Sequence, residues 1–492
     1  MTHPVARKRA IRIVAVGLIP LMLASCARSP ATGERIFTGG MSRQDERKIG
    51  AEQHPKLVRQ FGGEFDDEDI NGYVQDLGQK LAKRSEMPGL EWDFTVIDSG
   101  MVNAFALPGG YIHVTRGLVS LAENEAELAG VLGHEIGHVT ARHSAERYGS
   151  SVLANIAGLA GAIFLGRQAA NAIGTLSSVA LRGYSRSQEL EADTLGVRYL
   201  RRMNYAPEAM ATFLEKMRAN SRLQAVLRGL PPDTADQFDI MQTHPRTEKR
   251  VKQAIAAARD GRPDGKIGRA AFLSKLSGMR YGGGPKQGFV RQEKFLHPEL
   301  RFAFEVPSGF RLFNRPNQVV ARGPEAARIV FDMARTERPL TATTYLTRVW
   351  AKDARLSRVT RFEAHGKRAA TGRTRVRTRD GVRDLRVVAV RWDRTRFYRF
   401  MFVTAPAQTE RFDRAFQRTA RSLRPLSAEE AASLKPLRLN VHTVREGETV
   451  ADLAARLPFA DYKERRFRVL NGLDEGETVA PGDRVKLVVE GG

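Results

Sequence analysis

Cysteine is nearly absent from this 492-residue sequence, which contains only Cys26. A single cysteine excludes an intramolecular disulfide framework and any cysteine-rich zinc or iron–sulfur site. Acidic residues are also in deficit, because 55 Asp and Glu face 79 Lys and Arg and leave a formal net charge of +24. A basic excess of this size indicates nucleic acid, anionic lipid or an acidic polymer as a partner.

The rest of the composition is that of a globular protein, with 42% hydrophobic and 27% charged residues. These values exclude collagen-like, coiled-coil and fully disordered chains. At roughly 150 residues per domain, the length predicts about three domains.

The N-terminal segment lacks a run long enough to cross a membrane. Four basic residues between positions 7 and 12 precede an apolar run over 13–23, which is too short to span a bilayer. This order is typical of a signal peptide, here over residues 1–26. Its last four residues, LASC, resemble a bacterial lipobox, which predicts cleavage before Cys26 and acylation of that cysteine. Several acyl chains anchor a protein firmly.

The alternative is a plain secretory signal with an incidental cysteine. Ala27 follows the cysteine, at a position where Asp would retain a lipoprotein in the inner membrane. The expected location is therefore the periplasm, with a lipid anchor in the outer membrane. A periplasmic protein rarely meets nucleic acid, so we expect no nucleic acid as a partner.

The basic charge is concentrated in one part of the chain. The signal peptide holds four basic residues and no acidic ones, so the remainder carries +20. Residues 291–425 contain 31 Lys and Arg but 13 Asp and Glu, a net charge of +18. This region is expected to face anionic phospholipid, lipopolysaccharide or cell-wall anions.

Changes in residue pattern predict an α+β protein of several parts. The expected helices cover 46–90, 123–147, 187–220 and 245–260, and the expected strands cover 92–98 and 104–114, with a turn at Pro108-Gly109-Gly110. The expected parts are a tether over 27–45, a mainly helical domain with a small edge sheet over 46–281, an antiparallel α+β domain of unknown role over 286–425, and a small separate βααβ module over 440–490.

The apolar segment 151–181 allows two interpretations. It is either a transmembrane hairpin or a soluble pair of helices that covers a cleft. Neither half reaches the roughly 20 apolar residues that a span needs, which favours the soluble pair.

The segment GHEIGH at 133–138 carries the chemistry. His134 and His138 stand at i and i+4, so they share one face of a helix and can bind one Zn²⁺ together. Glu135 stands beside the first histidine, where it can act as the general base on the water that zinc activates. Two ligands and a base on one helix predict a zinc hydrolase.

A second helix can supply the third ligand that a catalytic zinc site needs. In SRSQELEAD, at 185–193, Glu189 is the expected ligand, and Asp193 one turn later can hydrogen-bond a ligand histidine. Glu191 is expected to point into solvent. The alternative for Glu189 is a surface charge.

Three further residues near the motif are not expected to bind the metal. Glu125 and Glu127 are explained by helix solubility, and His143 is expected to be structural because it lies off the ligand face. Four further histidines show no partner pattern: His54, His113, His297 and His442.

GHEIGHV followed some fifty residues later by SRSQELEAD resembles the HtpX/BepA-type zinc metallopeptidases, peptidase family M48, which also contains Oma-type and CAAX prenyl proteases. The resemblance covers roughly residues 40–260. It implies a zincin-type (HExxH) metallopeptidase domain, one Zn²⁺ held by His134, His138 and Glu189, and Glu135 as the catalytic base.

Two further motifs extend the resemblance. Asn103, Ala104, Phe105 and Ala106 resemble the family's edge strand, which can bind an extended substrate by β-augmentation; the alternative is an ordinary sheet edge. THPRTEKR at 243–250 resembles the family's H-P-x-x-x-x-R element. It implies that His244 approaches the zinc, either to stabilise the oxyanion or to hold the enzyme latent as a fourth ligand. Arg250 would stabilise the oxyanion or bind the substrate backbone.

The C-terminal module, from VHTVREGETVADLA at 441–454 onward, resembles a LysM domain. Such domains bind N-acetylglucosamine polymers such as peptidoglycan. The charged stretch 460–467 departs from the pattern, which leaves a degenerate packing domain open. The tetratricopeptide repeats of BepA-type relatives are not seen in the sequence, so no partner that depends on them is carried over.

These observations predict a lipid-anchored periplasmic zinc endopeptidase. Its expected substrates, implied by the resemblance, are misfolded or stalled envelope and outer-membrane proteins. The first alternative is a peptidoglycan- or anion-binding envelope scaffold or chaperone with a latent peptidase domain. The second is a cell-wall peptidase.

Overall fold

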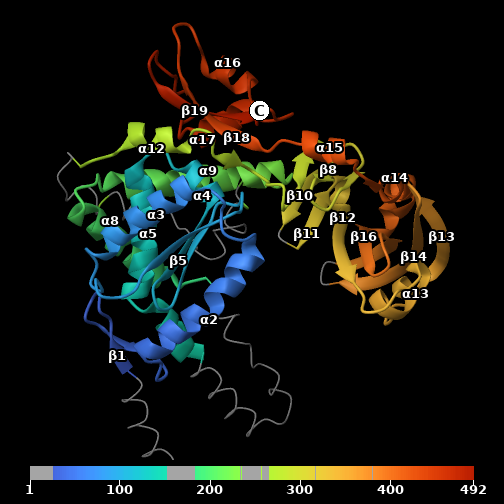
Figure 1. The fold of residues 1–492 in the computed structure, drawn as a ribbon, viewed down its shortest axis with the longest axis horizontal. Helices are drawn as coiled ribbons and strands as arrows, with labels where there is room; N and C mark the ends of the chain where they lie inside the picture. The colour runs from blue at the N-terminus through green and yellow to red at the C-terminus, as the bar shows by residue number, and fades with distance from the viewer. Residues whose placement is uncertain are drawn as a thin grey trace, which may run out of the picture.

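The computed structural model describes residues 26–151, 183–232, 265–315, 317–378 and 381–491, together with Thr234 and Ala256 (Figure 1). The expected signal peptide before Cys26 and almost all of the apolar segment 151–181 lie outside the described residues. So does the helix expected over 245–260, apart from Ala256.

The described chain begins with an ordered hairpin. Strands β1 (Cys26–Arg28) and β2 (Arg35–Phe37) pair antiparallel, and helix α2 (Arg43–Phe61) follows from a capping box at Ser42. The backbone N–H of Ala31 donates a hydrogen bond to the carbonyl of Thr140, and the Ala31 carbonyl accepts one from the Arg198 guanidinium. Both partners belong to helices described below. The tether expected over 27–45 is therefore corrected to a hairpin and helix start that contact the neighbouring domain.

A three-stranded sheet follows helix α3 (Glu68–Ala82). The strands are β3 (Asp93–Ile97), β4 (Ala104–Leu107) and β5 (Tyr111–Thr115), in the order β3-β5-β4, with β3 parallel and β4 antiparallel to β5. Gly109 and Gly110 form the turn between β4 and β5, with φ values of 86° and 98° that favour glycine. The two expected strands and the expected turn are confirmed, and β4 is an edge of the sheet.

Five further helices are described in this region: α4 (Arg116–Leu121), α5 (Glu125–Thr140), α8 (Arg186–Arg202), α9 (Glu208–Leu227) and α12 (Arg269–Leu276). Helices α5 and α8 pack closely because glycines face each other. A Cβ added to Gly133 would lie 3.3 Å from the Cα of Gly196, and one added to Gly137 would lie 3.3 Å from the Cα of Ala192. This close approach brings the side chains of the two helices to one site.

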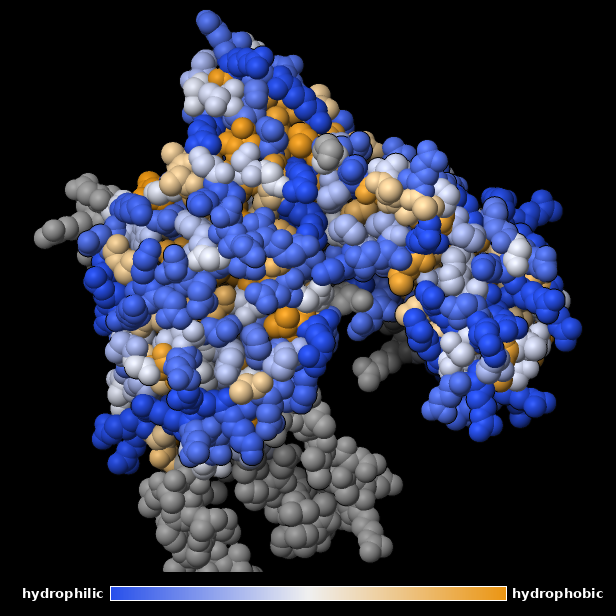
Figure 2. Space-filling view, in the orientation of Figure 1, coloured by the Kyte–Doolittle hydropathy of each residue, from blue (hydrophilic) through white to orange (hydrophobic). Residues whose placement is uncertain are grey.

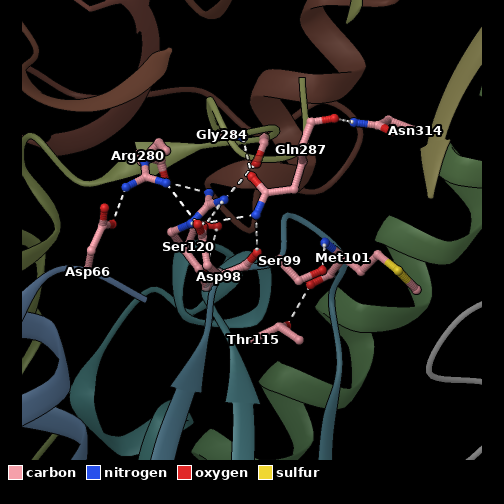
Figure 3. A network of polar contacts seen from close by, with 12 residues as sticks. Asp66, Asp98, Ser99, Met101, Thr115, Ser120, Arg280, Gly284, Gln287 and Asn314 are labelled. Atoms are coloured by element: carbon pink, nitrogen blue, oxygen red, sulfur yellow. Dashed lines mark hydrogen bonds and ion pairs between the residues drawn. The ribbon is translucent and has the colours of Figure 1, made fainter. Parts of the chain in front are cut away.

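A buried arginine connects this region to the chain that follows it. Arg116 donates from Nε and Nη2 to Asp98 Oδ1, at 3.1 and 3.0 Å. It also donates from Nη1 to the main-chain carbonyl of Arg280 and from Nη2 to that of Gly282, both at 2.8 Å. Figure 3 shows Arg280 and Gln287 reaching the same aspartate from the linker. The segment 280–287 is thus fixed to the loop after β3.

Residues 289–425 form antiparallel sheets with a few helices (Figure 1). A seven-stranded sheet has the order β10 (Arg311–Arg315), β11 (Gln318–Arg322), β12 (Arg328–Arg335), β16 (Arg396–Thr404), β15 (Gly381–Arg391), β14 (Lys367–Thr378) and β13 (Ser357–Ala364). A four-stranded sheet has the order β17-β9-β8-β7, with bounds Arg424–Pro425, Phe302–Glu305, Lys294–His297 and Phe289–Arg291. The described helical segments are η3 (Pro324–Ala326), α13 (Ala342–Tyr345), η4 (Leu346–Trp350), η5 (Pro406–Gln408) and α14 (Thr409–Arg421).

Aromatic residues fill the core of this domain while charged residues cover it. The buried core includes Phe302, Phe304, Phe331, Tyr398 and Phe400. Figure 2 shows mostly hydrophilic side chains on the visible face of the domain, at the right of the view. The high net charge therefore lies on the surface of a well-packed fold.

The C-terminal module follows a short helix α15 (Ala428–Ser433) and consists of a strand, two helices and a strand. Its elements are β18 (Leu437–Thr443), α16 (Val450–Ala455), α17 (Lys463–Leu470) and β19 (Arg484–Glu490). Strand β18 also pairs with β6 (Arg280–Tyr281), and the module shares one hydrophobic core with α3, α5, α9 and α12. The expectation of a separate module is therefore wrong: it packs onto the helices around the site (Figure 1).

None of the described helices combines the length and the apolar character that a membrane span requires.

Candidate metal centre and active site

Helix α5 presents the two predicted histidine ligands to one point. Asn124 caps the helix by accepting a hydrogen bond from the backbone N–H of Glu127, and the helix runs without interruption to Thr140. His134 and His138 are buried, and their Nε2 atoms lie 3.0 Å apart.

Helix α8 brings the predicted third ligand to the same point. It begins at a capping box formed by Ser185 and Gln188, which places Glu189 in the first turn. The Glu189 carboxylate oxygens lie 3.7 Å from His134 Nε2 and 3.5 Å from His138 Nε2. Glu189 is fully buried.

These three side chains fit a zinc ion. Their ligand atoms all lie within 4.8 Å of one another, and two imidazoles with one carboxylate are a donor set of catalytic zinc. Bonds of about 2.0–2.2 Å in a tetrahedron place ligand atoms roughly 3.4 Å apart, and the observed separations lie on both sides of that value. The group can therefore hold one metal ion without rearrangement of the backbone.

A second layer of side chains orients the two histidines. Asp193 Oδ1 lies 2.9 Å from His134 Nδ1, as the sequence predicts. His143 Nδ1 lies 2.7 Å from His138 Nδ1, and His143 Nε2 lies 3.3 Å from Glu191 Oε2. Such contacts fix which ring nitrogen of a ligand histidine is free to face a metal.

The chain of contacts from His138 to Glu191 corrects the expectation that Glu191 points into solvent. An unbroken helix would have carried His143 off the ligand face. Instead α5 ends at Thr140, and Arg142 adopts a left-handed conformation with φ 61°, which turns His143 back toward His138. A left-handed arginine leaves no signal in the residue pattern.

Tyr184 is a site residue that the sequence reasoning missed. Its ring stacks on the His138 ring, with centroids 3.7 Å apart and 13° between the planes, and the Arg147 guanidinium lies 3.8 Å from the tyrosine ring centroid. Burial raises the pKa of Tyr184, as do the nearby charges of Glu135 and Glu189, against the charge of Arg147. The one available signal is an aromatic residue directly before the α8 capping box.

Glu135, the predicted base, is buried beside the ligands. Its side chain is 2% exposed, and its charge acts on Tyr184 as described above. A carboxylate next to a metal site is placed to exchange a proton with a water molecule at that site.

A cavity of about 380 Å³ opens beside His138. It lies between α2, residues 86–90, the β4–β5 turn and the end of α5, and Arg142 is among its lining residues. Arg142 is itself paired with Glu46 of α2 at 2.9 Å. The cavity gives the metal centre a neighbouring space of the size of a few side chains.

The predicted substrate strand, β4, packs against helix α5. Asn103 precedes β4, and Ala104, Phe105 and Ala106 belong to it; all four residues are buried. The Phe105 ring stacks on His113, with centroids 4.7 Å apart. Binding of substrate to this edge stays a prediction.

His113 corrects a second expectation, because it does have a partner. His113 Nε2 lies 3.0 Å from His54 Nδ1 of α2. His442 Nε2 likewise lies 2.7 Å from Glu448 Oε2, and His297 Nδ1 accepts the N–H of Leu300 at 3.2 Å.

The two glutamates assigned to helix solubility are also corrected. Glu127 is buried and receives the Lys216 ammonium at 2.9 and 2.8 Å, while Glu125 accepts hydrogen bonds from the Tyr73 and Tyr205 hydroxyls. Helix α9 supplies the lysine that contacts Glu127, whereas the tyrosines that contact Glu125 come from α3 and from the residues before α9. His244 and Arg250 lie outside the described residues, so their proposed roles stay predictions.

Comparison with known proteins identifies the domain around this site. The profile described as Peptidase family M48 matches residues 68–258. The chain thus contains a region that matches peptidase family M48, the family that the two sequence motifs resemble, and the relatives described next are consistent with the HtpX/BepA type.

Curated relatives agree with this assignment. The beta-barrel assembly-enhancing protease of Escherichia coli K12 is 32% identical over 239 residues, which are 46% of this chain and 47% of that protein. The mitochondrial metalloendopeptidase OMA1 of Arabidopsis thaliana is 35% identical over 172 residues, 35% of this chain and 32% of that protein. The chain spans about half the length of the assembly-enhancing proteases it matches.

A solved structure of cyanobacterial PsbP from Synechocystis is 17% identical to part of this chain. The matched region is 30% of this chain and 98% of the PsbP chain. The TM-score is 0.23, which is too low to support any assignment.

Proposed function

We propose that the protein is a zinc-dependent endopeptidase that hydrolyses peptide bonds at the His134–His138–Glu189 centre. The observation that carries the proposal is the convergence of these three buried side chains beside Glu135, within a peptidase family M48 domain. Two imidazoles, one carboxylate and an adjacent buried base are the elements of metal-assisted hydrolysis.

In the proposed reaction, Glu135 moves the proton, and Asp193 and His143 orient the two ligand histidines. A bound zinc ion supplies Lewis acidity and makes water a better nucleophile at neutral pH. Glu135 would take the proton of the attacking water and pass it to the leaving amine. Asp193 Oδ1, 2.9 Å from His134 Nδ1, would favour a proton on Nδ1 and leave Nε2 as the metal-facing atom. His143 performs the same orientation for His138.

We further propose unfolded or stalled envelope proteins as substrates. Support comes from the relatives named beta-barrel assembly-enhancing protease, and from strand β4, an edge to which an extended chain can add by β-augmentation. His244 and Arg250 would assist the oxyanion, or His244 would hold the site latent.

The proposed location is the periplasm, with a lipid anchor at Cys26 in the outer membrane. Cys26 is exposed at the start of β1, which is compatible with acylation of its thiol. Peptidoglycan and anionic lipid or lipopolysaccharide remain the proposed envelope partners.

Metal removal and return test this function. The full chain is treated with a chelator and assayed on a chemically unfolded protein, and zinc is then added back. The proposal expects cleavage to disappear with the metal and to return with zinc at about one ion per chain. Cleavage that persists in the metal-free protein would contradict it.

The C-terminal module bears on the alternative of a binding scaffold. Its residues Phe467 and Leu453 are fully buried in the core shared with the peptidase region, which supports the interpretation as a packing domain. A Glu135→Ala strain that behaves like wild type would favour the scaffold or chaperone function.

A further inference from the structure

Three arginines stand directly opposite one another on adjacent strands of the basic domain. Arg311 of β10 is paired with Arg322 of β11, and Arg322 is paired with Arg328 of β12. Directly opposite residues project from the same face of a sheet, with Cβ atoms about 4.5–5.5 Å apart. We call these three residues the arginine row. Like charges in such a register repel each other.

Of the three arginines in the row, only Arg311 forms an ion pair with an acidic side chain among the described residues. Arg311 is paired with Asp461 of the C-terminal module at 2.8 Å. Within the described parts of the chain, neither Arg322 nor Arg328 forms an ion pair. Glu325, three residues after Arg322, is paired with Arg411 instead.

Two more arginines strengthen the positive field. Burial lowers the pKa of Arg322, and the charges of Arg328, Arg228 and Arg315 lower it further. The Arg228 guanidinium belongs to the residue after α9 and lies 5.8 Å from the centroid of the Phe313 ring. The charges of Arg228 and Arg315 thus add to that of Arg328 in the electrostatic environment of Arg322.

This place is a junction of three parts of the molecule. Arg311 donates to the carbonyls of Val226 and Leu227 in the last turn of α9, at 3.3 and 2.9 Å. Its ion pair with Asp461 adds the C-terminal module, and Figure 1 shows β10 near the end of α9. Arg311, at one end of the arginine row, is thus held in place from both sides.

We propose that the arginine row binds a phosphate group. A guanidinium presents a planar fork of N–H donors that matches phosphate oxygens, and an anion between Arg322 and Arg328 would convert mutual repulsion into attraction to a shared partner. The catalytic centre does not use this site. The phosphate belongs either to a soluble molecule or to a lipid headgroup, and these sources share the same recognition chemistry.

The first experiment measures binding of inorganic phosphate and pyrophosphate to the full chain. Calorimetry and thermal unfolding are run in a phosphate-free buffer at constant ionic strength. The variants are Arg322→Gln and Arg328→Gln, with Arg377→Gln as the charge-matched control. Arg377 is exposed in the same sheet, and its cross-strand neighbour is the neutral Val382.

The expected result is at least a tenfold weaker binding of pyrophosphate in Arg322→Gln and in Arg328→Gln, with wild-type binding in Arg377→Gln. Without phosphate, Arg322→Gln should have a melting temperature equal to or above that of wild type, because a repulsive charge is removed. Equal affinity in all four proteins, or the same loss in Arg377→Gln, would overturn the proposal.

The second experiment identifies the source of the phosphate. Vesicles of phosphatidylcholine with and without phosphatidylglycerol are sedimented with the same proteins. Vesicle binding that falls in Arg322→Gln but not in Arg377→Gln assigns a lipid headgroup. Soluble phosphate binding that depends on Arg322, with vesicle binding unchanged, assigns a free phosphate. Independence from Arg322 on both probes would refute the site.

Discussion

Lys486 Nζ lies 2.8 Å from Glu123 Oε1, and both side chains are buried although they stand 363 positions apart in the chain. The ammonium also donates to the carbonyls of Ser120, Leu121 and Ala122, which end helix α4 and have no partners of their own in the helix. Burial lowers the pKa of Lys486 to about 8, against the charge of Glu123, so the lysine remains charged at pH 7. This contact fixes the C-terminal module to the loop that precedes the HExxH helix.

Replacing this lysine should destabilise the whole unit. Lys486→Met leaves Glu123 buried with one cation fewer, and breaking a buried pair costs about 3 kcal/mol or more. Chemical denaturation of the full chain measures the loss. Lys435→Met, at an exposed position, serves as the control and should stay within about 0.5 kcal/mol of wild type. Equal stabilities of the two variants would show that the contact does not hold the module.

Acid should weaken the basic domain through a buried histidine. Burial lowers the pKa of His297 to about 4, while an unfolded histidine titrates near 6.5. Between these values the unfolded chain binds the proton and the folded chain does not, so the free energy of unfolding falls as the pH falls from 6.5 to 4. The expected slope for this residue is at most about 1.4 kcal/mol per pH unit.

Urea denaturation between pH 7 and pH 4 checks this dependence. His297→Asn keeps an acceptor near Nδ1 and should show a shallower loss of stability with acid than wild type. His365→Asn, exposed in the same domain, should show the wild-type slope. Identical slopes in all three proteins would contradict a neutral buried His297.

The contact of Asp193 with His134 should control metal affinity. Asp193→Asn removes the charge that orients the imidazole, and loss of such a partner lowers zinc affinity by about 10–100-fold. Competition with a chromogenic chelator measures the affinity. Glu191→Gln acts one histidine further away, through His143, and should have a smaller effect. An effect of Glu191→Gln as large as that of Asp193→Asn would reverse the assigned order.

Tyr184 should act through its ring more than through its hydroxyl group. Tyr184→Phe keeps the stack on His138 and should retain most of the activity. Tyr184→Ala removes the stack and the contact with Arg147, and we expect kcat/KM to fall by about tenfold or more, because a displaced ligand misplaces the reacting groups. Steady-state kinetics on an unfolded protein substrate distinguishes these outcomes. Equal loss in both variants would assign the effect to the hydroxyl group.

The core of the site could be predicted from the sequence because it depends on local spacing. His134 and His138 share a helix face by the i, i+4 rule, and Asp193 follows Glu189 by the same rule. Ligand residues of rare types at fixed spacing leave a signal that needs no tertiary structure. The strands around Pro108-Gly109-Gly110 were predictable for the same reason.

The rest depends on contacts that local patterns do not encode. Glu127 and Lys486 are charged, so a pattern assigns them to the surface, yet each finds a buried partner from a distant segment. His143 returns to the site through a left-handed arginine at 142. The docking of the C-terminal module follows from such pairs and could not be read from the sequence of either part.

Substitution of Glu135 tests whether this side chain is the base in zinc-dependent peptide hydrolysis. Glu135→Gln keeps the size of the side chain and leaves His134, His138 and Glu189 intact, so zinc content should stay at about one ion per chain. The account predicts that this zinc-loaded variant loses cleavage of unfolded protein by a factor of about 100 or more. Zinc-dependent cleavage at the wild-type rate in Glu135→Gln would contradict the account.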